Sequence, residues 1–230
     1  MRVGIGLWVG GVAAALALLV GSTVSAQTTG TRLDKNRGAP GSVSKRDSGS
    51  AIRVANAYAQ CLAQREGRSM RRALDLPFTS AEQAKAINRV SNEFDECLGN
   101  SGEFDELRLG QVLNAGGAAE YFVRTDLRRV DLSPLKAMTD EALAKTGYAP
   151  RTDLEDLGLC IVRADPAVSR ALIATAVTTE QETAAFRKLI PYIGPCVTVG
   201  SQLKLNVPNV RAIVAYALYR AASKLEVPDA

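Results

Sequence analysis

The sequence predicts an all-α fold of two homologous, disulfide-clasped helical units, a tandem duplication, after a signal peptide and a flexible linker. Three observations lead to this prediction. Apolar residues recur at helical spacing, capping motifs precede several of these segments, and the cysteines form two equally spaced pairs. The chain has 230 residues, of which 47% are hydrophobic and 23% charged, a composition typical of globular proteins.

Residues 1–26 have the pattern of a secretory signal peptide. Arg2 precedes an apolar stretch over residues 3–20, and the small-x-small pattern that signal peptidases cut after ends at Ala26. We therefore expect cleavage between Ala26 and Gln27, and a mature protein in the periplasm or outside the cell. The alternative is a retained membrane anchor, since the stretch is close to the shortest length that spans a bilayer.

Residues 27–50 predict a flexible linker, because only Leu33 and Val43 are larger aliphatic side chains among many Ser, Thr and Gly. The linker holds five basic and two acidic residues. Its charge of 5 − 2 = +3, together with Arg2, accounts for the formal net charge of +4. The rest of the chain is neutral overall, so the basic composition does not indicate a nucleic-acid partner.

The cysteines carry the evidence for an internal duplication. Cys61 and Cys97 are 36 residues apart, Cys160 and Cys196 are also 36 apart, and the second pair follows the first by 99. Four cysteines allow three pairings, and the equal spacing favours Cys61–Cys97 and Cys160–Cys196. Zinc or redox chemistry is the alternative, but no CxxC is present and an exported chain meets an oxidising environment.

The same shift of 99 residues aligns Thr79 with Thr178, and a three-residue deletion keeps later features in register. We therefore predict two copies of one unit, over residues 51–125 and 152–230, joined by a connector over residues 126–151.

Unit one is predicted to contain three main helices. Apolar residues recur at helical spacing over 52–62. A capping box at Ser80 and Gln83, or one residue earlier, begins the next helix. The third contains the sequence AGGAA at residues 115–119, whose glycines either permit close helix approach or mark a break.

Unit two repeats these features. Thr179 and Glu182 form a capping box, and Pro191 is expected to end that helix early. Asn209 is expected to cap the last helix, whose apolar residues form one face over 210–221.

Two charged clusters are candidate binding sites. A basic cluster after the first cysteine could bind an anion, because guanidinium groups suit phosphate and carboxylate. An acidic cluster around Cys97 could bind a hard cation such as calcium. For both clusters the alternative is a solvated surface with ion pairs. The basic residues are Arg65, Arg68, Arg71 and Arg72, and the acidic residues are Glu93, Asp95, Glu96, Glu103, Asp105 and Glu106.

The function that these patterns favour is a non-enzymatic module that binds an envelope component: a protein, a lipid head group or a cell-wall polymer. The chain has no histidine, which excludes histidine-dependent triads and a histidine base, and no cofactor is indicated. Contact with a membrane is expected only through the signal peptide before cleavage. The alternative is a hydrolase that acts on an envelope polymer with carboxylates from the acidic cluster.

Overall fold

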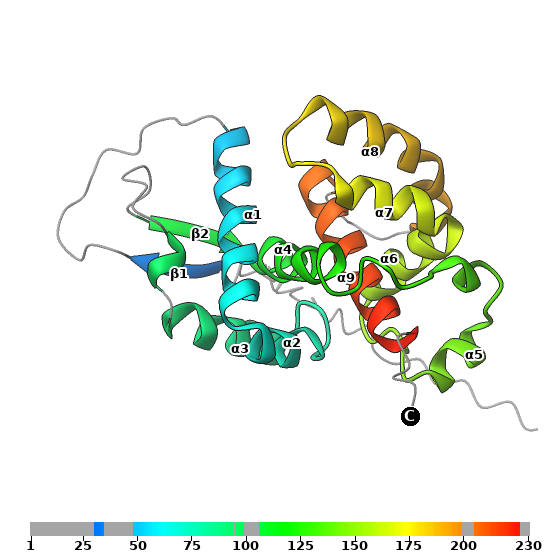
Figure 1. Cartoon of the computed structure of the whole chain (residues 1–230), viewed down its shortest axis with the longest axis horizontal. Helices are drawn as coiled ribbons and strands as arrows, with labels where there is room; N and C mark the ends of the chain where they lie inside the picture. The colour runs from blue at the N-terminus through cyan, green and yellow to red at the C-terminus, as the bar shows by residue number, and fades with distance from the viewer. Residues whose placement is uncertain (1–29, 35–47, 94, 99–105, 199–204, 226–230) are drawn as a thin grey trace, which may run out of the picture.

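The computed structural model describes residues 30–34, 48–93, 95–98, 106–198 and 205–225 (Figure 1). The predicted signal peptide lies outside these residues. The described chain is mostly helical, with two disulfides, as the sequence predicted. Among the described residues, no helix is long and apolar enough to cross a membrane.

The helices follow the same order in both halves of the chain. In the first half they are α1 (Ser48–Arg65), α2 (Gly67–Leu74), α3 (Ala81–Glu93), the 3₁₀ helix η1 (Asp95–Leu98) and α4 (Gln111–Arg124). In the second half they are α6 (Asp153–Ala164), α7 (Pro166–Ala174), α8 (Glu180–Ile193), η3 (Gly194–Cys196) and α9 (Val207–Leu225). The connector holds η2 (Ser133–Lys136) and α5 (Asp140–Lys145).

The described residues also contain one short antiparallel ribbon. Strand β1 (Gly30–Asp34) pairs with β2 (Glu106–Gly110), with Gly30 opposite Gly110 and Asp34 opposite Glu106. Strand β1 and the first three residues of α1 fall within residues 27–50, where the sequence predicts a linker, and the extent of that linker stays a prediction. The sequence does not predict the ribbon, because it forms between segments far apart in the chain, which local composition does not reveal.

Each half of the chain contains one disulfide, and the two disulfides join elements at equivalent places in the order of helices. Cys61 of α1 is bonded to Cys97 of η1, with Cα atoms 5.6 Å apart. Cys160 of α6 is bonded to Cys196 of η3, with Cα atoms 5.7 Å apart. The predicted pairing is confirmed, so in each half the first helix is held to the segment that follows the third.

The turn before the third helix has the same conformation in both halves. Thr79 and Thr178 have φ angles of 62° and 61°, and they are the non-glycine residues with positive φ in the described chain. The Thr79 N–H donates to Gln83 at 2.9 Å, and the Thr178 N–H donates to Glu182 at 2.6 Å. These hydrogen bonds offset part of the strain of a β-branched residue in the left-handed region.

Most of the predicted helix caps are correct, and two predicted helix ends are not. Thr179 accepts from the Glu182 N–H, as predicted. Helix α8 continues through Pro191, which lies in its last turn and so removes few backbone hydrogen bonds. Asn206, not Asn209, accepts at the start of α9, because Pro208 suits the first turn and extends the helix toward the N-terminus.

Helices α4 and α9 cross in the middle of the molecule, with α1 packed against α4 and α6 against α9 (Figure 1). A glycine lies at each of these three contacts. A Cβ on Gly116 of α4 would lie 2.3 Å from the Cβ of Ala212 on α9 and 2.5 Å from its Cα. A Cβ on Gly117 would lie 2.7 Å from the Cβ of Ala59 on α1. A Cβ on Gly158 of α6 would lie 2.9 Å from the Cβ of Ala217 on α9. The glycines of α4 therefore permit close approach and do not break the helix.

We expect Gly116→Ala to lower the free energy of unfolding by at least about 2 kcal/mol, because the added methyl would meet the backbone of α9. Urea denaturation of the oxidised protein measures this change. Gly67→Ala is the control, since its Cβ would meet only Phe122, at an ordinary 3.9 Å. It should leave stability unchanged or raise it by less than about 1 kcal/mol. Equal losses for the two variants would contradict the close-packing argument.

Candidate functional site

A buried ion cluster joins the two halves of the molecule at Arg211 of α9. Its guanidinium donates to both carboxylate oxygens of Glu120 on α4, at 2.9 and 2.8 Å, and to Glu182 on α8 at 3.1 Å. It also donates to the carbonyl oxygens of Leu172 and Thr175, at 3.0 and 2.7 Å. The side chains of Arg211, Glu120 and Glu182 are 3%, 2% and 8% exposed. Since each guanidinium nitrogen already donates to protein acceptors, the cluster holds helices together and offers no free donor to a ligand.

A second buried carboxylate, Glu155 of α6, also connects the halves. It accepts from the backbone N–H groups of Phe78 and Arg151, both at 2.7 Å. The Phe78 ring stacks on Tyr216 of α9 with centroids 4.2 Å apart, and the Tyr216 hydroxyl lies 2.8 Å from the Leu74 carbonyl, to which it can donate. These contacts fix the α2–α3 turn of the first half against the second half.

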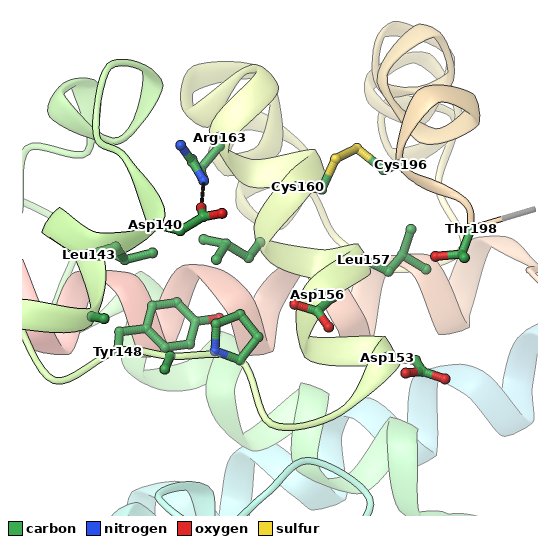
Figure 2. Close-up of a pocket in the computed structure, with 14 residues that line it drawn as sticks. Asp140, Leu143, Tyr148, Asp153, Asp156, Leu157, Cys160, Arg163, Cys196 and Thr198 are labelled. Atoms are coloured by element: carbon green, nitrogen blue, oxygen red, sulfur yellow. Dashed lines mark hydrogen bonds and ion pairs between the residues drawn. A yellow bond between two sulfur atoms is a disulfide. The ribbon is translucent and has the colours of Figure 1, made fainter.

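A pocket of about 690 Å³ lies between the connector and the second half of the chain. Figure 2 shows its walls: α5 with the turn that follows it, helix α6, and the segment around the Cys160–Cys196 disulfide. Leu143, Leu157 and Leu159 give it an apolar surface. A volume of this size suits a small molecule or one to two side chains of a larger partner.

Three aspartates give the pocket an acidic rim. Asp140 forms an ion pair with Arg163, which also donates to the Met138 carbonyl. Asp153 and Asp156, both exposed on the first turn of α6, have no ion-pair partner among the residues that the structure describes. The charge of the lining residues is therefore 1 − 3 = −2, from one arginine and three aspartates.

The surroundings of Asp156 disfavour its ionised form. Burial raises the pKa of its carboxyl, and the carboxylates of Asp153, Glu155 and Asp140 raise it further. The negative charges thus oppose one another, and the ionised form of Asp156 is less favourable in the folded chain than in the unfolded chain. A cation in the pocket would relieve this repulsion.

Tyr148 forms part of the pocket wall and is fully buried. Its hydroxyl has no hydrogen-bond partner in the described part of the chain. Burial raises the pKa of this hydroxyl far above its ordinary value, so it stays protonated. In Figure 2 the hydroxyl end of the ring points to the side on which Asp156 lies.

The predicted basic cluster lies on α1 and α2 and is partly occupied by internal contacts. Arg65 pairs with Glu96 at 2.9 Å. Arg71 pairs with Asp126, and its guanidinium lies 4.0 Å from the centroid of the Phe122 ring. The remaining two members are exposed. Arg72 donates to Ser69 at 3.4 Å, and Arg68 forms no ion pair with another described residue. Anion binding at this cluster stays a prediction.

The predicted acidic cluster is only partly within the described residues. Glu103 and Asp105 lie outside them, and Glu96 is paired with Arg65. Within the described ranges, no group of three or more acidic or cysteine side chains is placed to hold a metal ion. The cation site, and the hydrolase that would use Glu93, Asp95, Glu103 and Asp105, stay predictions.

The sequence patterns do not predict the pocket. The one sequence feature that lies at the pocket is the acidic first turn of α6, where Asp153, Glu155 and Asp156 follow the Thr152 cap. Such a turn is favourable at any helix N-terminus and so does not by itself indicate a site. Comparisons with protein-family models, with curated proteins and with solved structures found no match to this chain.

We expect Arg211→Met to lower the free energy of unfolding by about 3–5 kcal/mol, because Glu120 and Glu182 would be left buried without a counter-charge. Adding Glu120→Gln and Glu182→Gln to this variant should restore part of the loss. Arg124→Met is the control: it also removes a partner of Glu120, but one that is 43% exposed. It should cost less than about 1 kcal/mol. Equal losses for the two single variants in urea denaturation would show that the cluster is not a structural clasp.

We expect Asp153→Asn to lower the pKa of Asp156 toward its ordinary value, because after burial itself the charge of Asp153 raises this pKa most. A carbon-detected NMR titration of the Asp156 carboxyl measures this shift. Glu180→Gln is the control, since Glu180 begins α8 as Asp153 begins α6 but does not line the pocket. An unchanged pKa in Asp153→Asn would disprove the coupling between the two carboxyls.

Proposed function

We propose that this protein is an exported, non-enzymatic binding module that recognises another component of the cell envelope through the pocket between α5, α6 and η3. One observation carries the proposal. The buried side chains of Arg211 and Glu155 form hydrogen bonds with other parts of the protein. The pocket carboxylates of Asp153 and Asp156, by contrast, have no cationic partner among the described residues. Ligand pockets typically combine an apolar surface with a small number of polar or charged groups.

Export is supported by two independent features. Residues 1–26 have the composition of a signal peptide, with the predicted cleavage after Ala26. Both disulfides join segments 36 residues apart, and such bonds persist in oxidising compartments. We place the mature protein in the periplasm or outside the cell on these grounds.

A tandem duplication accounts best for the scaffold. The two halves repeat the order of helices and the disulfide, and the left-handed turns at Thr79 and Thr178 are 99 residues apart, as are the two disulfides. A strained conformation at a β-branched residue is rare, so its occurrence at both equivalent positions favours common descent. The pocket belongs to one half only, because the connector supplies α5.

The proposal is tested by placing a photo-crosslinking amino acid at Ala149, which is exposed and lines the pocket. After irradiation of the organism that encodes the protein, we expect a discrete crosslinked product, because the partner lies in the pocket. Non-reducing peptide mapping of the same material should find a mature start at Gln27 and both disulfides.

The matched control carries the crosslinker at Ala184, an exposed alanine of α8 that does not line the pocket. Identical products from the two positions, or none from Ala149, would contradict binding through the pocket. An intact Met1 with free thiols would contradict export.

A further inference from the structure

We propose that four arginines on α2 and on the turn after α4 form a docking surface for a hydrophilic phosphate polymer. These residues, which we call the arginine patch, are Arg68 and Arg72 of α2 and Arg128 and Arg129 of the turn over residues 125–129. The surface is separate from the pocket between α5, α6 and η3, and the inference does not rest on the function proposed for that pocket.

Positive charge is concentrated in the two segments that carry the patch. Residues 65–72 and 124–129 hold seven arginines, no lysine, one glutamate and one aspartate, so their formal charge is 7 − 2 = +5. Residues 51–230 as a whole have no net charge, with 28 − 6 = 22 basic and 24 − 2 = 22 acidic side chains. A local excess of this kind on a neutral domain attracts a polyanion to one surface.

The patch consists of the arginines that the fold does not use. Three of the seven form ion pairs within the protein: Arg65 with Glu96, Arg71 with Asp126 and Arg124 with Glu120. The four members of the patch are exposed and form no ion pair with another described residue. Apart from the hydrogen bond that Arg72 donates to Ser69, their guanidinium groups are available to a ligand.

The turn that carries half of the patch is held by one arginine from each half of the chain. Arg71 of α2 pairs with the Asp126 side chain, and Arg170 of α7 donates to three backbone carbonyls within residues 127–130, at 3.3, 2.6 and 2.9 Å. Positions 71 and 170 are 99 residues apart, as are the two disulfides. A backbone fixed from two sides positions its arginines before a ligand arrives, which lowers the entropic cost of binding.

The ion pair between Arg71 and Asp126 also brings the two parts of the patch together. On α2, Arg68 and Arg72 lie one turn apart, and Arg71 is a neighbour of Arg68 on the helix surface. The two patch arginines of the turn follow Asp126 by two and three residues, so their Cα atoms lie within about 7 and 11 Å of its Cα. The four guanidinium groups therefore lie on both sides of one ion pair, where successive anionic groups of one polymer can reach them.

The lack of exposed apolar anchors decides the kind of polyanion. In the part of the chain that the structure describes, the one exposed large hydrophobic side chain is Ile190 of α8, and Figure 1 shows α8 at the top and α2 near the bottom. Protein interfaces depend on buried aromatic or aliphatic anchors, insertion into a bilayer on apolar side chains, and single-stranded nucleic acids on aromatic stacking. A guanidinium fork, by contrast, needs only the oxygens of a phosphate.

Fluorescence anisotropy of a labelled linear polyphosphate, with the oxidised protein, tests the inference. We expect binding at low salt that weakens about fiftyfold between about 50 and 200 mM salt, because four phosphate contacts release counterions. Polygalacturonate, a carboxylate polymer, and vesicles of phosphatidylglycerol are the comparison ligands. Both should bind more weakly than polyphosphate at equal concentration of anionic groups.

Two double variants remove one part of the patch each: Arg68→Gln with Arg72→Gln, and Arg128→Gln with Arg129→Gln. Each should weaken polyphosphate binding about tenfold at low salt, and the weakening between about 50 and 200 mM salt should fall to about sevenfold, since two contacts remain. This change in salt dependence reports the number of phosphate contacts, which a purely structural role of the arginines would not alter.

The matched control combines Arg187→Gln with Lys188→Gln, two exposed cations of α8 whose loss changes the net charge equally. It should bind polyphosphate within about twofold of the unchanged protein and keep the full salt dependence. Circular dichroism verifies the fold of each variant, and if one patch variant does not fold, the other decides the test.

The inference is overturned if polyphosphate does not bind at about 1 mM phosphate, or if the control loses as much affinity as the patch variants. Equal or tighter binding of polygalacturonate or of the vesicles also overturns it, because the partner would then be a carboxylate polymer or a membrane surface. The crosslinks at Ala149 and Ala184 decide the proposed function separately, since both positions lie outside the arginine patch.

Discussion

The close contact between α4 and α9 is the constraint on which the rest of the structure depends. Gly116 lies against the backbone of Ala212, and no larger residue fits between the two helices. Because each of these helices also carries one flanking helix, α1 or α6, their separation sets the position of all four. The same proximity brings Glu120 within hydrogen-bond distance of Arg211.

The buried charges are paired with one another, whereas the two aspartates at the pocket are not. Arg211, Glu120 and Glu182 lie where water is excluded, and mutual hydrogen bonds offset the cost of burying them. Asp153 and Asp156 lie at the surface, where solvent lowers the cost of leaving them unpaired. The fold thus keeps its unpaired charge where a partner could reach it.

Much of the scaffold could be predicted from the sequence, because it depends on local patterns. Cysteine spacing gave the disulfide pairing, and Thr179 was recognised as a helix cap. The β1–β2 ribbon was missed, since its strands pair across more than seventy residues. The pocket was missed for a related reason: Asp140 and Asp156 come together only when the connector packs against α6.

The Cys160–Cys196 disulfide is itself part of the pocket wall. Before this bond forms, nothing covalent holds η3 and the following Thr198 against α6. A newly made, still reduced chain would therefore carry the aspartates without a fixed cavity beside them. Formation of the disulfide would fix this wall of the pocket, so that assembly of the pocket depends on the redox state of Cys160 and Cys196.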